Sequence, residues 1–496
     1  MPSSLQTLMF GHEFNQSLDR VNLPSGLKTL AFGWAFNQSL SAAHLPSDLQ
    51  TLTFDDRFNQ SLEDVSLPSS LQTLTLAHMF NQKLNEVKLP GGLQTLTFGD
   101  MFNQCLDDVE LPGGLRALTF GYRYNQSLEY VNLPSALETL TFGRRFGRSL
   151  VMVKLPSGLQ NLIFGHKLNR SMDPVALNPH QELEEVKNRS FVPWPKALRS
   201  VTFAANFKNC WKRGDLPDTV ERLTFGYDFN ESLDGVKWPK GLQTLIFGNE
   251  FNQKLDGLSL PMELQTLTLG DSFNQRLDGV ELPRSLQTLK FGKSFNRSLH
   301  RVELPGSIRS LTLGRSFDQS LVGVALPSSL QTLTLGDKFN QSFDGVKLPE
   351  GLKTLTFGFE FNQKLDGINL PSGLQTLTFG FEFNQSLDRV NLPSGLQTLE
   401  FGSQFNRSLA GVTLPTGLQT LIFDDEFNQS LDQVKLPSGL QKLAIGHGYT
   451  HRLDRVTLPS SLHTLLCFCH HKTLGNFVVP DSVREFHLNA VDVSMS

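Results

Sequence analysis

The chain has 496 residues and a formal net charge of −4, with acidic and basic residues scattered evenly along it. The absence of a basic stripe argues against a nucleic-acid-binding protein, and no apolar run approaches the ~20 residues of a membrane-spanning helix. Four cysteines are too few for a disulfide framework and no signal-peptide pattern opens the chain, so we expect a cytoplasmic protein that binds neither nucleic acid nor membrane.

Regularly spaced prolines mark a 22-residue repeat. They recur from Pro2 to Pro156 and again from Pro195 to Pro459. Positions in each unit are counted from its proline, so that offset 12 is the twelfth residue after it. A unit this short cannot bury its apolar residues alone, and stacking on its neighbours is required. The sequence therefore predicts a mainly β solenoid of about 21 coils.

The sequence divides into four segments that differ in how closely they match the repeat. Residues 1–172 form an N-terminal repeat array, 173–194 a degenerate coil or insertion, 195–479 a C-terminal array, and 480–496 a C-terminal cap, all within one continuous solenoid. The first repeat has no equivalent cap. This predicts either end-to-end self-association at the N-terminus or a chain that is part of a longer protein.

Two strings in each unit favour extended structure. In the unit that begins at Pro371 they are "LQTLTF" and "LDRVNL", and both end in an apolar alternation of period two. We expect two short strands per coil. Glycine at offset 9 would end the first strand by adopting a positive φ, and the next proline would end the second.

Two further positions predict rows of stacked side chains inside the solenoid. Offset 12 is aromatic in nearly every unit, and offset 13 is usually asparagine, whose short amide can satisfy a turn and reach the next coil. The predicted structural ladder includes Phe36, Phe58, Phe251, Phe273, Phe339, Phe383, Asn37, Asn59, Asn252, Asn274, Asn340 and Asn384.

The repeat resembles the FNIP repeat family, a variant of the leucine-rich repeat with the same unit length. "LPSGLQTLTFGFEFN", residues 370–384, matches the family pattern through its Phe-Asn pair, and the resemblance covers nearly all of residues 1–465. Where the family has Pro-Ile, this chain has Ser386 and Leu387. The string L-x-x-V-x-L-P is also similar to the strand of certain bacterial leucine-rich repeats. These resemblances imply a curved solenoid with one sheet on its concave side, and a protein-binding role.

Catalytic and metal-binding motifs are hardly represented. No Ser/His/Asp set, P-loop or HExxH motif stands out, so we expect neither an enzyme nor a cofactor. The cluster "CFCHH", with Cys467, Cys469, His470 and His471, could supply zinc ligands but lacks the usual spacing, and a filler of the last coil is the favoured interpretation. An acidic row at offset 17, which could hold calcium or form a solvated edge, contains Asp234, Asp256, Asp278, Asp344, Asp366 and Asp388.

Threonine at offsets 5 and 7 offers an alternative function. Units such as those with Thr354 and Thr356, or Thr376 and Thr378, repeat a Thr-x-Thr pattern like that of ice-binding β-solenoids. Threonine also suits an exposed strand position because it is β-branched. A structural or ice-binding rod is therefore the alternative to an interaction scaffold.

The positions that vary from coil to coil are offsets 10, 11, 18 and 20. A constant frame with variable exposed residues is typical of repeat scaffolds that bind proteins. The preferred interpretation is a non-enzymatic protein-interaction scaffold with an unidentified protein partner. Aromatic residues at offset 10 are the candidate anchors for that partner, namely Trp34, Tyr122, Tyr227, Phe359 and Phe381.

Overall fold

The computed structural model describes residues 2, 4–148, 150, 152–165, 194–203, 216–468 and 479–488. The chain forms two compact units, Met1–Gly248 and Asn249–Ser496, and each is described by itself. Of the segment predicted as a degenerate coil or insertion, 173–194, only Trp194 lies within the described residues. No helix in this part of the chain is long and apolar enough to cross a membrane.

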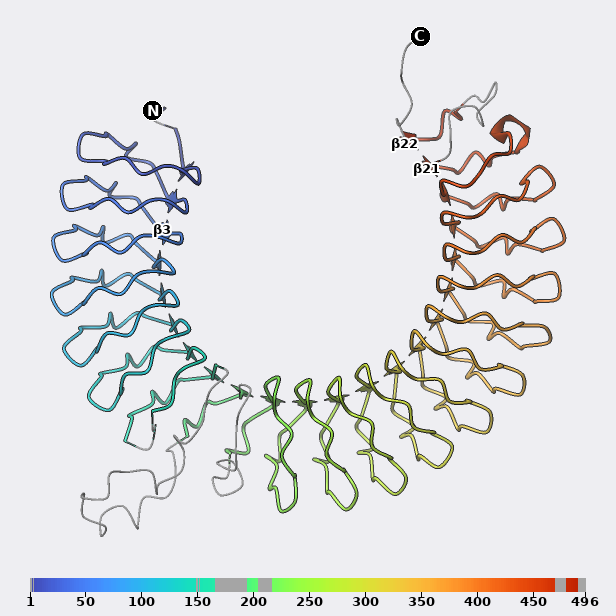
Figure 1. The fold of residues 1–496 in the computed structure, drawn as a ribbon, viewed down its shortest axis with the longest axis horizontal. Coiled ribbons are helices and arrows are strands. Elements are labelled where there is room, and N and C mark those ends of the chain that lie inside the picture. The colour runs from blue at the N-terminus through green and yellow to red at the C-terminus, as the bar shows by residue number, and fades with distance from the viewer. Residues whose placement is uncertain are drawn as a thin grey trace. The chain divides into compact units, whose positions relative to one another are not determined.

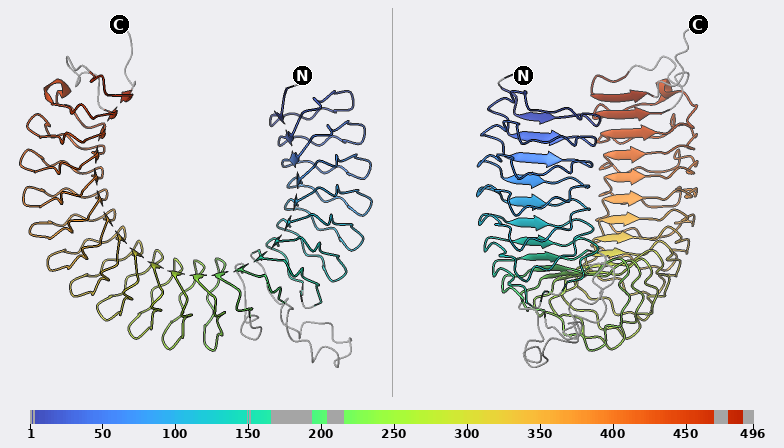
Figure 2. Two further views of the ribbon diagram at one scale, coloured as in Figure 1. Left: turned by 180° about the vertical axis from the view of Figure 1, so that it is seen from behind. Right: turned by 60° about the vertical axis from the view of Figure 1, so that its left-hand side comes forward.

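Each unit is a stack of coils with short parallel strands side by side along its inner edge (Figures 1 and 2). The first unit contains β1 Thr7–Met9, β2 Thr29–Phe32, β3 Thr51–Phe54, β4 Thr73–Thr75, β5 Thr95–Thr97, β6 Ala117–Thr119, β7 Thr139–Thr141, β8 Asn161–Ile163, β9 Ser200–Thr202, β10 Arg222–Thr224 and β11 Thr244–Ile246. The second contains β12 Thr266–Thr268, β13 Thr288–Lys290, β14 Ser310–Thr312, β15 Thr332–Thr334, β16 Thr354–Thr356, β17 Thr376–Thr378, β18 Thr398–Glu400, β19 Thr420–Ile422, β20 Lys442–Ile445, the 3-10 turn η2 Leu453–Arg455, β21 Thr464–Cys467 and β22 Glu485–Leu488.

Within each unit every strand pairs in parallel with the next strand along the chain. The register joins equivalent residues of successive repeats, as in Thr354↔Thr376 and Leu355↔Leu377. Between β21 and β22 the step from Thr464 to Glu485 is 21 residues, because the last coil is one residue shorter. Of the predicted cap, residues 480–488 are described, and β22 lies in them.

The predicted mainly β, leucine-rich-repeat-like solenoid with its 22-residue period is confirmed, but the described coils hold one strand each and not two. In the coil that begins at Pro371, two turns close the backbone. Leu374 N donates to Pro371 O at 3.0 Å, and Val390 N donates to Leu387 O at 2.9 Å. The string L-x-x-V therefore buries its two apolar residues through a turn. The sheet is built from "TLT", and the expectation of a strand in L-x-x-V-x-L-P was wrong.

The core fills each coil with the same side chains. In the coil that begins at Pro371, the side chains of Leu374, Leu377 and Phe383 are fully buried, and those of Phe379 and Leu387 are nearly fully buried. The rings of Phe379 and Phe383 stack on their equivalents in the coils on either side, so a coil's stability depends on its neighbours.

The glycine at offset 9 has a different role from the one predicted. The positive φ values occur at offset 18, for example 78° at Gly345 and 73° at Gly367, in the turn of the second string. At offset 9 the backbones of successive coils approach so closely that a Cβ on Gly380 would lie 1.8 Å from the carbonyl oxygen of Gly358. Close stacking, and not a left-handed conformation, therefore requires glycine there.

Candidate interaction surface

The aromatic residues at offset 12 lie inside the solenoid. The rings of Phe36 and Phe58 stack with their centroids 6.0 Å apart, and those of Phe361 and Phe383 stack at the same distance. Every aromatic member of the predicted ladder is at most 1% exposed: Phe36, Phe58, Phe251, Phe273, Phe339 and Phe383. These rings stabilise the stack and cannot contact a partner.

The asparagines at offset 13 connect successive coils by hydrogen bonds. Asn37 Oδ1 accepts from the backbone N–H of Asn59 at 2.9 Å and from Gln60 Nε2 at 3.1 Å. The same acceptor role is taken by Asn59, Asn252, Asn274, Asn340 and Asn384, each toward the following coil. Asp318 replaces asparagine in one coil, and its Oδ1 accepts from Asn340 N at 3.0 Å. The side-chain oxygen that asparagine and aspartate share is therefore the group that accepts these bonds.

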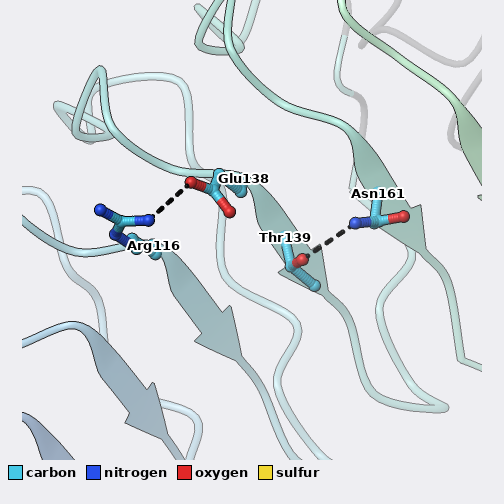
Figure 3. A network of polar contacts seen from close by, with 4 residues as sticks. All are labelled: Arg116, Glu138, Thr139 and Asn161. Atoms are coloured by element: carbon cyan, nitrogen blue, oxygen red, sulfur yellow. Dashed lines mark hydrogen bonds and ion pairs between the residues drawn. The ribbon is translucent and has the colours of Figure 1, made fainter.

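The strand face carries the side chains at offsets 5 and 7, which are mostly half-buried. Thr356 lies in register with Thr334 and Thr378, so short threonine rows do form. The rows are broken where β13 has Lys290 and β18 has Glu400. The adjacent offset 4 carries charged pairs, and Figure 3 shows Arg116 bonded to Glu138 at 3.2 Å beside the bond from Asn161 to Thr139.

The aromatic candidates at offset 10 follow the strands, at the turn after the glycine. Trp34 is 36% exposed, Tyr227 49%, Phe359 47% and Phe381 37%, whereas Tyr122 is half-buried. All five are thus accessible, in contrast to the rings at offset 12.

In the first unit an arginine of the following coil covers two of these rings. The guanidinium of Arg57 lies 3.7 Å from the centroid of the Trp34 ring, and that of Arg145 lies 5.3 Å from the centroid of the Tyr122 ring. Both arginines occupy offset 11. Cation–π attraction of this kind holds a ring in place and removes one of its faces from solvent.

In the second unit Phe359 and Phe381 stack on each other at the surface. Their centroids are 4.6 Å apart and their planes differ by 1°. The residues at offset 11 in these two coils are Glu360 and Glu382. This exposed pair departs from the pattern of buried rings at offset 12 and of arginine-covered rings at Trp34 and Tyr122.

Most charged residues at offset 10 are paired with the adjacent coil. Lys293 Nζ lies 2.8 Å from Asp271 Oδ2, and Arg315 Nε lies 2.8 Å from Asp337 Oδ2. In the first unit His78 Nδ1 lies 3.2 Å from Asp100 Oδ2. The row at offset 10 is therefore largely self-neutralised on the side that precedes the phenylalanine pair.

The metal-binding hypotheses gain no support from the geometry. Cys467 is fully buried in the core position of offset 8, while Cys469, His470 and His471 lie outside the described residues. In the part of the chain that the structure describes, no three His, Cys, Asp or Glu side chains are grouped so that they could hold a metal ion. At offset 17 the backbone N–H of Asp388 is bonded to Ser386 Oγ at 3.1 Å, which is a local turn contact.

Comparison with known proteins agrees with this geometry. The FNIP Repeat model matches eleven segments, namely residues 1–34, 36–78, 80–123, 124–167, 229–272, 251–294, 273–302, 295–338, 339–382, 383–426 and 427–466. The chain belongs to the FNIP repeat family. The matched segment 383–426 includes Ser386 and Leu387, where the sequence differs from the resemblance noted above.

Solved structures include relatives of these FNIP repeats. CroV588, described as a novel circular LRR protein, is 34% identical with a TM-score of 0.74, and the match covers 98% of this chain and 76% of that one. TLR13 in a complex with ssRNA13 is 15% identical with a TM-score of 0.52, covering 94% and 67%, so it shares the fold alone. YopM from Yersinia enterocolitica is 19% identical with a TM-score of 0.46, covering 98% and 91%. No curated protein matches the chain significantly.

The arginines that cover the aromatic rings were not predicted from the sequence. Arg57 follows Trp34 by one position more than a full repeat, and Arg145 follows Tyr122 by the same spacing. Pairing offset 10 of one coil with offset 11 of the next would have identified them. The same spacing pairs Phe359 with Glu382 and Tyr227 with Glu250, so a glutamate stands at the arginine's position in both cases.

Proposed function

We propose that this chain is a non-enzymatic scaffold whose partner is a protein, bound at the turn that follows each strand. The observation that supports the proposal is the division of aromatic residues. Those at offset 12 are buried in every ladder member named above, whereas Trp34, Tyr227, Phe359 and Phe381 are between 36% and 49% exposed. Burial of exposed aromatic side chains commonly supplies much of the binding energy of protein interfaces.

The arrangement of the exposed residues supports the same proposal. Leucine, phenylalanine and asparagine are repeated in the core and the ladder, and offsets 10 and 11 differ from one coil to the next. A constant frame holds the variable side chains on stacked turns one strand spacing apart, about 4.8 Å. A surface of this kind recognises an extended protein segment residue by residue.

Affinity capture with the full chain tests the proposal. The variant Trp34→Ser, Phe359→Ser, Phe381→Ser should lose the captured protein, because its main anchors are removed. A matched variant, Tyr130→Ser, Met152→Ser, Val322→Ser, removes exposed apolar residues at offsets 17 and 18 and should retain it; these three are 69%, 49% and 47% exposed. Equal loss in both variants, or retention in both, would contradict the assignment of this surface.

A further inference from the structure

The phenylalanine pair lacks the internal cation that covers equivalent rings. Arg57 N donates to Trp34 O at 3.1 Å, which places its side chain one coil above the ring that it covers. Glu382 N donates to Phe359 O at 2.9 Å, so Glu382 has the backbone position of Arg57, but the stacked ring of Phe381 covers Phe359 from this coil. Gln404 N donates to Phe381 O at 2.9 Å, so an uncharged side chain has the covering position next to Phe381. Neither ring of the pair therefore has an arginine at the covering position.

Three glutamates lie in the two coils of the pair and in the coil that follows them. Glu360 and Glu382 follow the two phenylalanines directly in the sequence, and all three groups, including Glu400, are half-buried. Glu400 Oε2 accepts from Thr378 Oγ1 at 3.3 Å, and this bond draws the carboxylate over β17, the strand of the coil that carries Phe381. The pair and these carboxylates form a surface that we name the aromatic–acidic patch: Phe359, Phe381, Glu360, Glu382 and Glu400.

Positive charge next to the patch is small. On its N-terminal side Arg315 is paired with Asp337 at 2.8 Å, and Lys338 occupies offset 11 of that coil. At offsets 10 and 11 of the four coils from Pro327 to Pro393, Lys338 is the one cationic residue, whereas the patch presents three carboxylates. A cationic ligand is therefore electrostatically favoured over an anionic or apolar one.

We infer that the aromatic–acidic patch binds an arginine of an extended protein segment, which stacks on the ring pair as Arg57 stacks on Trp34 within this chain. The guanidinium plane stacks on the exposed ring of the pair, and the carboxylates of Glu360, Glu382 and Glu400 accept its N–H groups. Arginine suits the site better than lysine because its planar, weakly hydrated guanidinium combines ring stacking with bidentate hydrogen bonding. This inference rests on the proposed scaffold function and names the chemistry of the partner.

Fluorescence anisotropy with a defined probe tests the inference on the full chain. The probe is a fluorescein-labelled Gly-Ser nonapeptide with two arginines, compared with the same peptide carrying citrulline or lysine at both places. We expect the citrulline peptide to bind at least tenfold more weakly and the lysine peptide about threefold more weakly. The variant Phe359→Ser, Phe381→Ser should weaken the arginine peptide about tenfold.

A pair of charge-matched variants isolates the role of the charge at position 382. Glu382→Arg replaces one of the three carboxylates by a cation beside the ring pair, so it should weaken binding of the arginine peptide at least about tenfold. Glu426→Arg makes the same charge change two coils further on, where Glu426 N bonds to Ser403 O at 2.9 Å and no aromatic ring lies at offset 10. It should change the affinity by less than about twofold at 150 mM salt, because exposed charges beyond a Debye length are screened.

The outcomes separate this inference from the proposed function. Equal binding of arginine and citrulline peptides, or equal effects of Glu382→Arg and Glu426→Arg, would overturn the arginine assignment. If protein capture still depended on Trp34, Phe359 and Phe381, the scaffold function would stand even though the arginine assignment had failed. Loss of specific capture with intact arginine binding would refute the scaffold function alone.

Discussion

The asparagine ladder allows a quantitative test of what joins one coil to the next. Asn362 Oδ1 accepts from the backbone N–H of Asn384 at 2.9 Å and from Gln385 Nε2 at 2.9 Å. Asn362→Ala removes this oxygen and leaves two half-buried donors without it. An unsatisfied buried donor costs about 1–3 kcal/mol, so for two half-buried groups we expect a loss of about 2 kcal/mol.

The natural aspartate at position 318 supplies the control. Asp318 Oδ1 accepts from Asn340 N at 3.0 Å and from Gln341 Nε2 at 2.9 Å, which is the same pair of bonds. Asn362→Asp keeps an oxygen in this place and should cost less than about 0.5 kcal/mol, because both bonds remain. The comparison separates the acceptor from the amide group as a whole.

Hydrogen exchange at the Asn384 amide is the appropriate assay, since a long repeat array need not unfold in one step. A loss of about 2 kcal/mol corresponds to roughly 30-fold faster exchange through local opening. Urea unfolding followed by circular dichroism provides the overall midpoint. If Asn362→Ala and Asn362→Asp exchanged at the same rate, the ladder oxygen would not be the group that connects the coils.

Three further predictions concern packing and the threonine rows. Tyr124→Phe should raise the free energy of unfolding by about 1 kcal/mol, measured by urea titration, because the Tyr124 hydroxyl is buried without a hydrogen-bond partner and burial raises its pKa; an unchanged midpoint would show that the hydroxyl is satisfied in solution. Gly380→Ala should lower the free energy of unfolding by more than about 3 kcal/mol, since its Cβ would lie 1.8 Å from a carbonyl oxygen, whereas Gly306→Ala, where nothing lies within 4 Å, should be nearly neutral. Purified protein should show no thermal hysteresis, because the threonine rows are interrupted by Lys290 and Glu400; hysteresis abolished by Thr376→Lys would instead favour the ice-binding function.

The fold follows from the sequence because its information is periodic. Prolines at a constant spacing set the coil, and leucines at fixed offsets identify the core, so the solenoid and its register are readable without coordinates. The second strand was predicted wrongly because a turn can bury two apolar residues three positions apart as well as a strand can. Val346 N bonds to Phe343 O at 3.0 Å across Gly345, whose φ of 78° belongs to a turn and not to a strand.

The candidate site is less readable because it depends on contacts between coils. The aromatic residues at offset 10 were identified as variable, but the sequence does not show which ring is covered. Coverage of Trp34 by Arg57 depends on the side chain of the following coil reaching back across the stack, at 3.7 Å. Within one repeat, nothing relates offset 10 to offset 11 of another. In the stack, the side chain at offset 11 of one coil contacts the ring at offset 10 of the coil before it, as Arg57 contacts Trp34.

The invariant parallel register has a consequence for how such an array can change. Equivalent residues face each other at every step, as Leu355 faces Leu377, so the loss or gain of one whole unit replaces each core contact by one of the same kind. The exposed turns differ in sequence from coil to coil, so the gain or loss of a repeat gives them new neighbours. A repeat inserted between the coil of Phe359 and the coil of Phe381 would separate the two rings while leaving the hydrophobic core intact. Recombination between repeats can therefore change the neighbours of the exposed turns while each core contact keeps its kind.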